Sequence, residues 1–282
     1  MKKLLAVLLS FCMLFCLAAC GTNNTSSDDI SNNDVSETEK APEHVVIPQF
    51  IGLTKAEAEN LATSLGLKVN LIDDTYSADY EDGKIIKQSS EKDVVMIKGA
   101  TITLTVNNAY YKHFNFKLID HNTTVWHTQR LGGGVVPEDP TVEHLEKGTY
   151  ILASLNKDNL PTNLQIPETY NGVRVTAVFR RLLDGTSVET ITFPKTITAV
   201  GGNLCGDTCN CPSLKNIICL GDNPFYLGSF SLDNNQLAGG CKIYVPDSQI
   251  NVYKTSEIGE IPFKSYADLI VPISTLDENI KN

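Results

Sequence analysis

The pattern of hydrophobic and polar positions divides the first 44 residues into two segments. Lys2 and Lys3 precede an apolar run from Leu4 to Leu17, and small residues follow. A basic start, a short apolar core and small residues form the pattern of a secretory signal peptide. The run is shorter than the roughly 20 apolar residues that cross a bilayer. We therefore expect residues 1–19 to be a signal peptide rather than a membrane helix.

The next residue is a cysteine, in the sequence Leu17-Ala18-Ala19-Cys20. This sequence resembles a bacterial lipobox, which implies cleavage before Cys20 and acylation of its thiol, as with palmitate. A plain secreted protein would not need a cysteine at this place. The resemblance therefore implies a lipoprotein held at the membrane by a lipid on Cys20. Together with the resemblances of the later modules, it places the chain on the extracellular face of a Gram-positive-type envelope.

Residues 20–44 are dominated by Ser, Thr, Asn, Asp and Glu, and only Ile30, Val35 and Ala41 interrupt the polar run. Such a segment buries too little apolar surface to offset the entropy of ordering. We expect a disordered tether with a mean reach of roughly 25–30 Å.

Residues 45–107 show both helix and strand patterns. Thr54 and Glu57 have the spacing of a capping box, apolar residues then recur at helical spacing, and Gly66 ends the predicted helix. Strands are predicted by apolar runs and period-two patterns at residues 45–47, 67–72, 84–88 and 101–106. The unit is expected to be α+β.

Several short segments of this unit follow one family pattern: Ile47-Pro48, Ile51-Gly52-Leu53, Gly66-Leu67-Lys68-Val69 and Ile102-Thr103-Leu104. With them the unit resembles the PASTA domain of cell-wall enzymes and kinases. The resemblance implies one helix packed on a three-stranded sheet, and either muropeptide binding or a spacer role. Ser90 and Asp93 replace the family's usual proline and glycine, although Asp tolerates a left-handed turn better than most residues.

Residues 108–164 are predicted to form a small β-rich connector. Alternation at 114–118 and an apolar run at 149–153 predict strands, and residues 126–129 are a candidate for another. Three glycines and two prolines predict a loop at 132–140. This order resembles the internalin-type B-repeat, a small ubiquitin-like extracellular module, although its usual aromatic ending is missing.

Residues 165–272 contain an internal repeat. The segment 175–178 recurs at 197–200, an offset of 22 residues, and 187–191 recurs at 213–217, an offset of 26. Periods of 20–29 residues are typical of leucine-rich solenoids, in which each turn adds one strand to a stacked sheet. We expect successive rungs to stack Ile191 on Ile217 and Ile217 on Ile243, and likewise Phe193, Cys219 and Val245.

The landmarks Ile166-Pro167, Tyr170-Asn171-Gly172, Thr192-Phe193-Pro194 and Ile243-Tyr244-Val245-Pro246 resemble BspA-like leucine-rich repeats. Leu182 and Gly185 depart from that pattern. The expected fold class is therefore multi-domain: a PASTA-like α+β unit, a β-rich connector and a short leucine-rich β-solenoid, ending in a tail at residues 273–282.

Five cysteines remain after Cys20, and all lie in the last third of the chain: Cys205, Cys209, Cys211, Cys219 and Cys241. Cys211, Cys219 and Cys241 occupy interior positions of the repeat, where free cysteine packs as a small hydrophobe. A Cys205–Cys209 disulfide is the weaker alternative, and a tetrahedral zinc site the weakest. We therefore expect no metal and no other cofactor.

Charge and motifs restrict the functional classes. The net charge of −10 becomes about −12 without Lys2 and Lys3, which excludes nucleic-acid binding through clustered cations. No catalytic or phosphate-binding motif is present. The histidines suggest no site: His44, His113, His121, His127 and His144.

The sequence predicts a non-enzymatic lipoprotein that binds a ligand or presents a binding surface at the cell envelope. Its expected partners are the membrane, through Cys20, peptidoglycan, and an extracellular protein, which would make it an adhesion-type molecule. Two alternatives remain open. One is a structural stalk without a ligand, and the other is an enzyme or accessory subunit of cell-wall metabolism with a site in residues 108–164.

Overall fold

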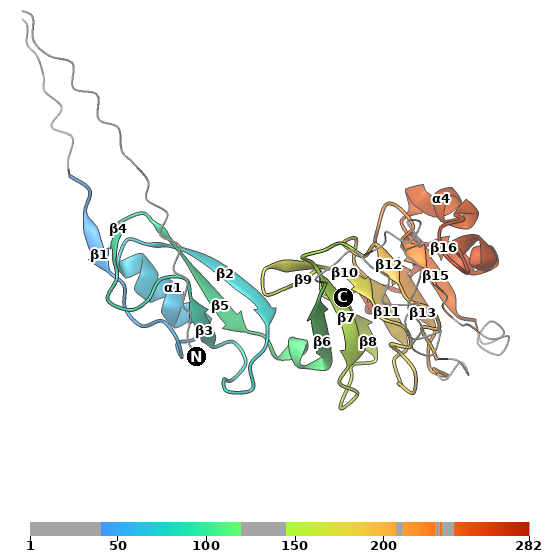
Figure 1. Ribbon diagram of the computed structural model, residues 1–282, viewed down its shortest axis with the longest axis horizontal. Helices are drawn as coiled ribbons and strands as arrows, with labels where there is room; N and C mark the ends of the chain where they lie inside the picture. The colour runs from blue at the N-terminus through green and yellow to red at the C-terminus, as the bar shows by residue number, and fades with distance from the viewer. Residues whose placement is uncertain are drawn as a thin grey trace, which may run out of the picture. The chain divides into compact units, whose positions relative to one another are not determined.

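The computed structural model describes residues 41–119, 145–206, 211–228, 230, 232 and 240–281 (Figure 1). Within these residues the architecture is mixed α/β, with many strands and few helices. The predicted signal peptide, Cys20 and most of the tether lie outside the described residues, as do the candidate strand at 126–129 and the loop at 132–140.

The first part of the described chain has one full helix and two small sheets. Its elements are β1 (His44–Val46), α1 (Lys55–Ser64), β2 (Lys68–Thr75), β3 (Ile85–Gln88), β4 (Val95–Ile97) and β5 (Thr101–Asn107). β5 lies between β2, to which it is parallel, and β3, to which it is antiparallel, while β1 pairs with β4. The predicted helix and strands are present, and β4 is a strand that the sequence analysis did not predict.

Local signals at both ends fix the boundaries of α1. The amide of Thr54 donates to the Glu57 carboxylate at 2.7 Å, and the amide of Glu57 donates to the Thr54 hydroxyl at 3.3 Å, which completes the capping box. At the other end Gly66 takes a φ of 73°, where a side chain would be disfavoured. The replacement of glycine by Asp93 is accommodated in the same way, with a φ of 68°.

The core of this part lies between α1 and the β2–β5–β3 sheet. Ala58 and Ala62 of α1 belong to one buried cluster with Ile102, Leu104 and Val106 of β5. Because alternate side chains of a strand point to opposite faces, the threonines between these residues face away from the core. One face of the sheet is therefore apolar and covered, and the other is polar.

The rest of the chain builds two larger sheets after a short 3₁₀ helix, η1 (Ala109–His113). One sheet contains β6 (Phe114–Leu118), β7 (Tyr150–Leu155), β9 (Thr169–Tyr170), β10 (Val173–Val178), β12 (Ala199–Val200) and β14 (Tyr226–Leu227). The other contains β8 (Asn163–Gln165), β11 (Thr190–Phe193), β13 (Asn216–Cys219), β15 (Lys242–Val245) and β16 (Ile270–Pro272).

Neighbouring strands of the second of these sheets are parallel and in register (Figure 1). The aligned residues are fully or almost fully buried: Leu164, Ile191, Ile217, Ile243 and Ile270. The predicted stacking of the three isoleucines is confirmed, and so is the pairing of Phe193 with Cys219. Each strand of this sheet thus contributes one aligned aliphatic side chain to the same buried row.

The sheet that contains β7, β10, β12 and β14 contributes a second row of buried aliphatic side chains. Leu152, Val178, Val200 and Leu227 are aligned on parallel strands, and none is exposed. They share one buried cluster with the isoleucine row. The predicted offset of 22 residues is confirmed, because Val178 pairs with Val200. β7 lies directly beside β10, so the strands on the two sides of the expected boundary at 164/165 pair within one sheet.

Short helices cover the C-terminal end: η2 (Asp247–Gln249), α4 (Ile250–Thr255), η3 (Phe263–Leu269), η4 (Ile273–Thr275) and α5 (Glu278–Lys281). Tyr253 of α4 is completely buried, and its hydroxyl donates to the carbonyls of Gly221 and Asn223, at 2.9 and 3.1 Å. This residue therefore satisfies two backbone groups while it closes the core.

The isoleucine row yields a stability prediction. Ile217→Ala should lower the free energy of unfolding by about 2–5 kcal/mol, because a fully buried side chain in the middle of the row leaves a cavity. Leu220→Ala, one residue beyond β13 and 42% exposed, should cost about 0.5 kcal/mol or less. Urea denaturation followed by circular dichroism measures both changes, and equal losses in the two variants would contradict the assigned register.

Candidate functional site

A pocket lies on the face of the β2–β5–β3 sheet that points away from α1; most of its lining residues are polar, but most of its exposed wall is apolar. Its volume is about 230 Å³. Its lining residues on this sheet are Ile72 and Asp74 of β2, Lys87 and Gln88 of β3, Ser89, and Thr103 and Thr105 of β5. The two threonines are the outward-facing neighbours of core residues, so the strand's alternation itself creates the polar floor.

The border of the pocket is completed by Asn171, from the turn between β9 and β10. Asn171 and Gly172 have φ values of 51° and 74°, and the flanking residues Tyr170 and Val173 pair across the hairpin. An Asn-Gly pair is favoured in two-residue hairpin turns because both positions require the left-handed region. The local sequence therefore specifies the turn that reaches the pocket.

Asp74 joins this turn to the sheet. Its backbone carbonyl accepts a hydrogen bond from the amide of Asn171 at 3.1 Å, and its Oδ2 atom accepts one from the amide of Gly172 at 2.7 Å. Asp74 is only 5% exposed, and its Oδ1 atom has no hydrogen-bond partner among the described residues. The pocket wall thus contains a buried carboxylate with one oxygen bound and one oxygen unsatisfied.

Aromatic side chains also hold the β9–β10 hairpin in place. The ring of Tyr170 stacks on Phe116, with centroids 4.5 Å apart, and on Tyr111, at 6.3 Å. The Tyr111 hydroxyl donates to the carbonyl of Thr169 at 3.0 Å. Burial, and then the nearby charge of Asp74, raise the pKa of Tyr111, so its hydroxyl stays protonated and remains a donor at neutral pH.

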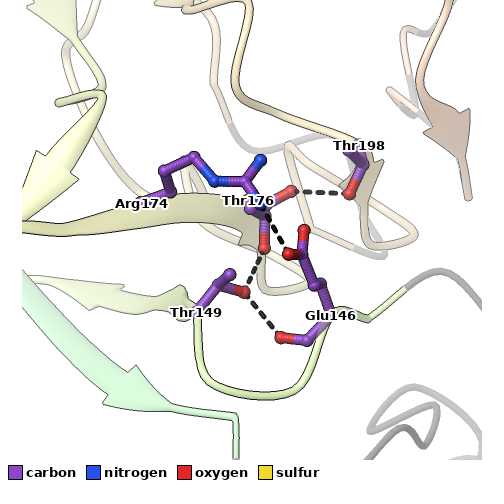
Figure 2. A network of polar contacts seen from close by, with 5 residues as sticks. All are labelled: Glu146, Thr149, Arg174, Thr176 and Thr198. Atoms are coloured by element: carbon purple, nitrogen blue, oxygen red, sulfur yellow. Dashed lines mark hydrogen bonds and ion pairs between the residues drawn. The ribbon is translucent and has the colours of Figure 1, made fainter.

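A second polar cluster surrounds three threonines: Thr176 in β10, and Thr149 and Thr198, which directly precede β7 and β12 (Figure 2). The hydroxyls of Thr149 and Thr176 lie 2.6 Å apart. Thr149 donates to the Glu146 carbonyl at 2.7 Å, so Thr176 must donate to Thr149. Thr198 donates to the Thr176 carbonyl at 3.2 Å, and Arg174 pairs with the Glu146 carboxylate at 2.5 Å. The hydroxyls of Thr149 and Thr198 bind backbone carbonyls, so the cluster supports the sheet.

The cysteines correct one prediction. Cys205 and Cys211 form a disulfide with their Cα atoms 5.3 Å apart, so the expectation that Cys211 packs as a free thiol is wrong. The error has a physical cause: burial suits a half-cystine as well as a free cysteine, and the spacing of six residues did not reveal the turn that brings the two together. Cys209, the alternative partner for Cys205, lies outside the described residues.

Cys219 and Cys241 are free and buried, as predicted. Burial strongly raises the pKa of Cys219 and raises that of Cys241 to about 12. In the described part of the chain, no three His, Cys, Asp or Glu side chains come close enough to hold a metal ion. The two thiols therefore belong to the hydrophobic core rather than to a reactive site.

The candidate histidines are not brought together in the described residues. His44 is exposed in β1, whereas His113 is buried at the end of η1, where burial and then Lys112 lower its pKa. The Nδ1 atom of His113 has no hydrogen-bond partner among the described residues, and its ring contacts Tyr110. The other three, His121, His127 and His144, lie outside the described residues.

Tyr170-Asn171-Gly172 stood out in the sequence as a repeat landmark, but no sequence pattern indicated the pocket beside it. The pocket depends on Asp74, 98 residues earlier in the chain, and no local pattern connects the two positions. Cys20, the predicted lipidation site, lies outside the described residues. None of the helices in the described part has the length and apolar character required to cross a membrane.

Comparison with known proteins identifies one part of the chain. Residues 45–108 match the family model of the PASTA domain, which agrees with the resemblance found at residues 45–107. A search of the curated proteins finds no match to the chain. The pocket therefore lies largely on a PASTA-type sheet, with Asn171 contributed from outside the matched residues.

Thiol labelling tests the cysteine assignment. In native buffer without reductant, Cys219 and Cys241 should resist iodoacetamide, because the reactive thiolate is suppressed by burial. After denaturation, the tryptic peptide of residues 196–215 should gain two further labels on reduction, measured by mass spectrometry. The gain should persist in a Cys209→Ser variant and vanish in Cys211→Ser. Labelling of Cys205 without reductant would contradict the disulfide.

Proposed function

We propose that this chain is a non-catalytic lipoprotein of the cell surface that contacts the cell wall through its PASTA-type unit. The observation that carries the proposal is the match of residues 45–108 to the PASTA family model. PASTA domains are linked to peptidoglycan and related cell-wall ligands. The open polar face of the β2–β5–β3 sheet supports the proposal, since it offers hydroxyl and charged groups on a rigid surface.

The pattern around Cys20 supports an anchor on the outer face of the membrane. Signal-type residues precede it and a polar run follows it as far as His44, where β1 begins. A tether of this length would reach roughly 25–30 Å, enough to hold the PASTA-type unit away from the bilayer and near the wall. The disulfide between Cys205 and Cys211 also suits an oxidising, extracellular setting.

The C-terminal part would present a surface to an extracellular protein. Its aligned isoleucines recur every 26 or 27 residues, which supports the interpretation as BspA-like leucine-rich repeats. Stacked repeats expose an extended surface that other proteins of this architecture use for binding. We therefore propose an adhesion role; the hydroxyls of Thr149 and Thr198 in Figure 2 bind backbone carbonyls and have structural roles.

Sedimentation with purified peptidoglycan tests the wall contact. A polypeptide of residues 42–110 should pellet with peptidoglycan sacculi, and a scrambled polypeptide of the same composition should stay in solution. The full chain should also pellet, and a chain that lacks residues 45–108 should not. If residues 42–110 behave like the scrambled control, the unit is a spacer and the chain is a stalk.

Metabolic labelling tests the anchor. Cys20→Ala should abolish incorporation of labelled palmitate and move the protein from the membrane fraction to the medium or the soluble fraction. Cys12→Ala and Cys16→Ala are matched controls, because these cysteines lie inside the predicted signal peptide and should have no effect. Unchanged labelling of the Cys20→Ala variant would overturn the lipoprotein assignment.

A further inference from the structure

The pocket beside Asp74 contains an acceptor that the fold does not use. Its Oδ2 atom is satisfied by the amide of Gly172, whereas Oδ1 is buried and has no hydrogen-bond partner among the described residues. Buried polar groups in native proteins are almost always hydrogen-bonded, because desolvation without a partner is costly. Because Asp74 also lines the pocket, its negative charge would attract a positively charged group of a bound molecule.

An opposite charge borders the same pocket. Lys87 projects from β3, is exposed, and forms no ion pair with a described residue. Its ammonium group is therefore available to a carboxylate of the bound molecule. A ligand with both an ammonium and a carboxylate group would use both walls of the pocket.

The size and the remaining lining agree with such a ligand. The volume of about 230 Å³ is smaller than the roughly 300–1,000 Å³ of pockets for drug-sized molecules. Thr103 and Thr105 supply hydroxyls, and Ile72 supplies an apolar contact for a short aliphatic side chain. The space suits a single amino-acid unit rather than an extended polymer.

We propose that this pocket binds a zwitterion of amino-acid size, with the ammonium group on Asp74 and the carboxylate group on Lys87. The site is composite, since Asn171 and Gly172 of the β9–β10 hairpin complete it and hold the Asp74 carboxylate in position. A free amino acid and the peptide of the cell wall share this chemistry. Binding of the cell-wall peptide rests on the proposed wall contact, whereas binding of a free amino acid does not.

Other ligand classes use the pocket less well. An anion without an ammonium group would meet the charge of Asp74. A divalent metal ion would require several oxygen ligands, and no group of three candidate side chains comes together in the described residues. A neutral sugar would leave both charges unused, and it serves as a negative probe.

Chemical-shift titration of the ¹⁵N-labelled full chain in detergent tests the proposal. Alanine should shift the amide resonance of Gly172 saturably, because this amide is hydrogen-bonded to Asp74. N-acetylalanine lacks the ammonium group and ethanolamine lacks the carboxylate, so both should bind about tenfold more weakly or worse. Glucose should cause no saturable shift.

Two matched variants distinguish loss of the Asp74 charge from loss of the folded hairpin. Asp74→Asn keeps an oxygen for the Gly172 amide and removes the charge, so it should weaken alanine binding about tenfold or more. Asp73→Asn makes the same change at the exposed neighbouring residue and should leave binding unaltered. A retained Gly172 resonance shows that Asp74→Asn has kept its hairpin. Equal affinity in the two variants, or no saturable shift with any probe, would overturn the proposal.

The source of the ligand is decided by muropeptides released from sacculi by a muramidase. If they bind at Gly172 and lose affinity in Asp74→Asn, the wall is a source and the composite site is confirmed. If alanine binds but muropeptides and sacculi do not, the pocket holds a free amino acid and the wall contact fails. If sacculi retain the chain while no probe shifts Gly172, the wall contact holds through another surface and this proposal fails.

Discussion

In-register stacking of aliphatic side chains between parallel strands organises most of this molecule. The row that contains Ile191, Ile217 and Ile243 meets a second row from the other sheet in one buried cluster. Each such side chain contributes about 1.5–3 kcal/mol through burial, more than the roughly 0.5–1.5 kcal/mol of a hydrogen bond such as those of the threonine cluster. Insertions are therefore accommodated in the loops at the ends of the strands, where they do not disturb the strand register.

The β9–β10 hairpin is one such insertion, and its turn contacts the β2–β5–β3 sheet through Asp74. Its turn donates two amides to Asp74, and the stacked rings of Tyr170 and Phe116 hold its base. The hairpin has only two residues in its turn, so the reach and direction of the donors are set by backbone geometry. A functional site at this point would combine a sheet face specified by one segment with a turn specified by another.

The sequence was sufficient where the signals were local or periodic. The capping box at Thr54, the left-handed position of Asp93 and the offset that aligns Ile191 with Ile217 depend on short-range patterns, and the structure has all of them. β4 was missed although Val94–Ile97 is an apolar run like the one that predicted β1; its pairing is set by β1, about 50 residues earlier in the chain. The pocket could not be predicted, because Asp74 meets its partners only after two distant segments have packed.

The disulfide shows the same limit. The three closely spaced cysteines indicated a bridge or packed thiols, but the pairing of Cys205 with Cys211 is decided by how the chain turns between them. A local pattern of cysteines contains no information on which two side chains face each other. Strand register, by contrast, repeats with a fixed period and is visible in the sequence.

The burial of Cys219 and Cys241 has a consequence for the permanence of that disulfide. Thiol–disulfide exchange begins with attack by a thiolate on one of the bridge sulfurs, and the rate depends on access and on the fraction of thiolate. Both thiols are buried, and burial raises their pKa values far above neutrality. The folded core thus withholds these two thiols from exchange with the Cys205–Cys211 bridge.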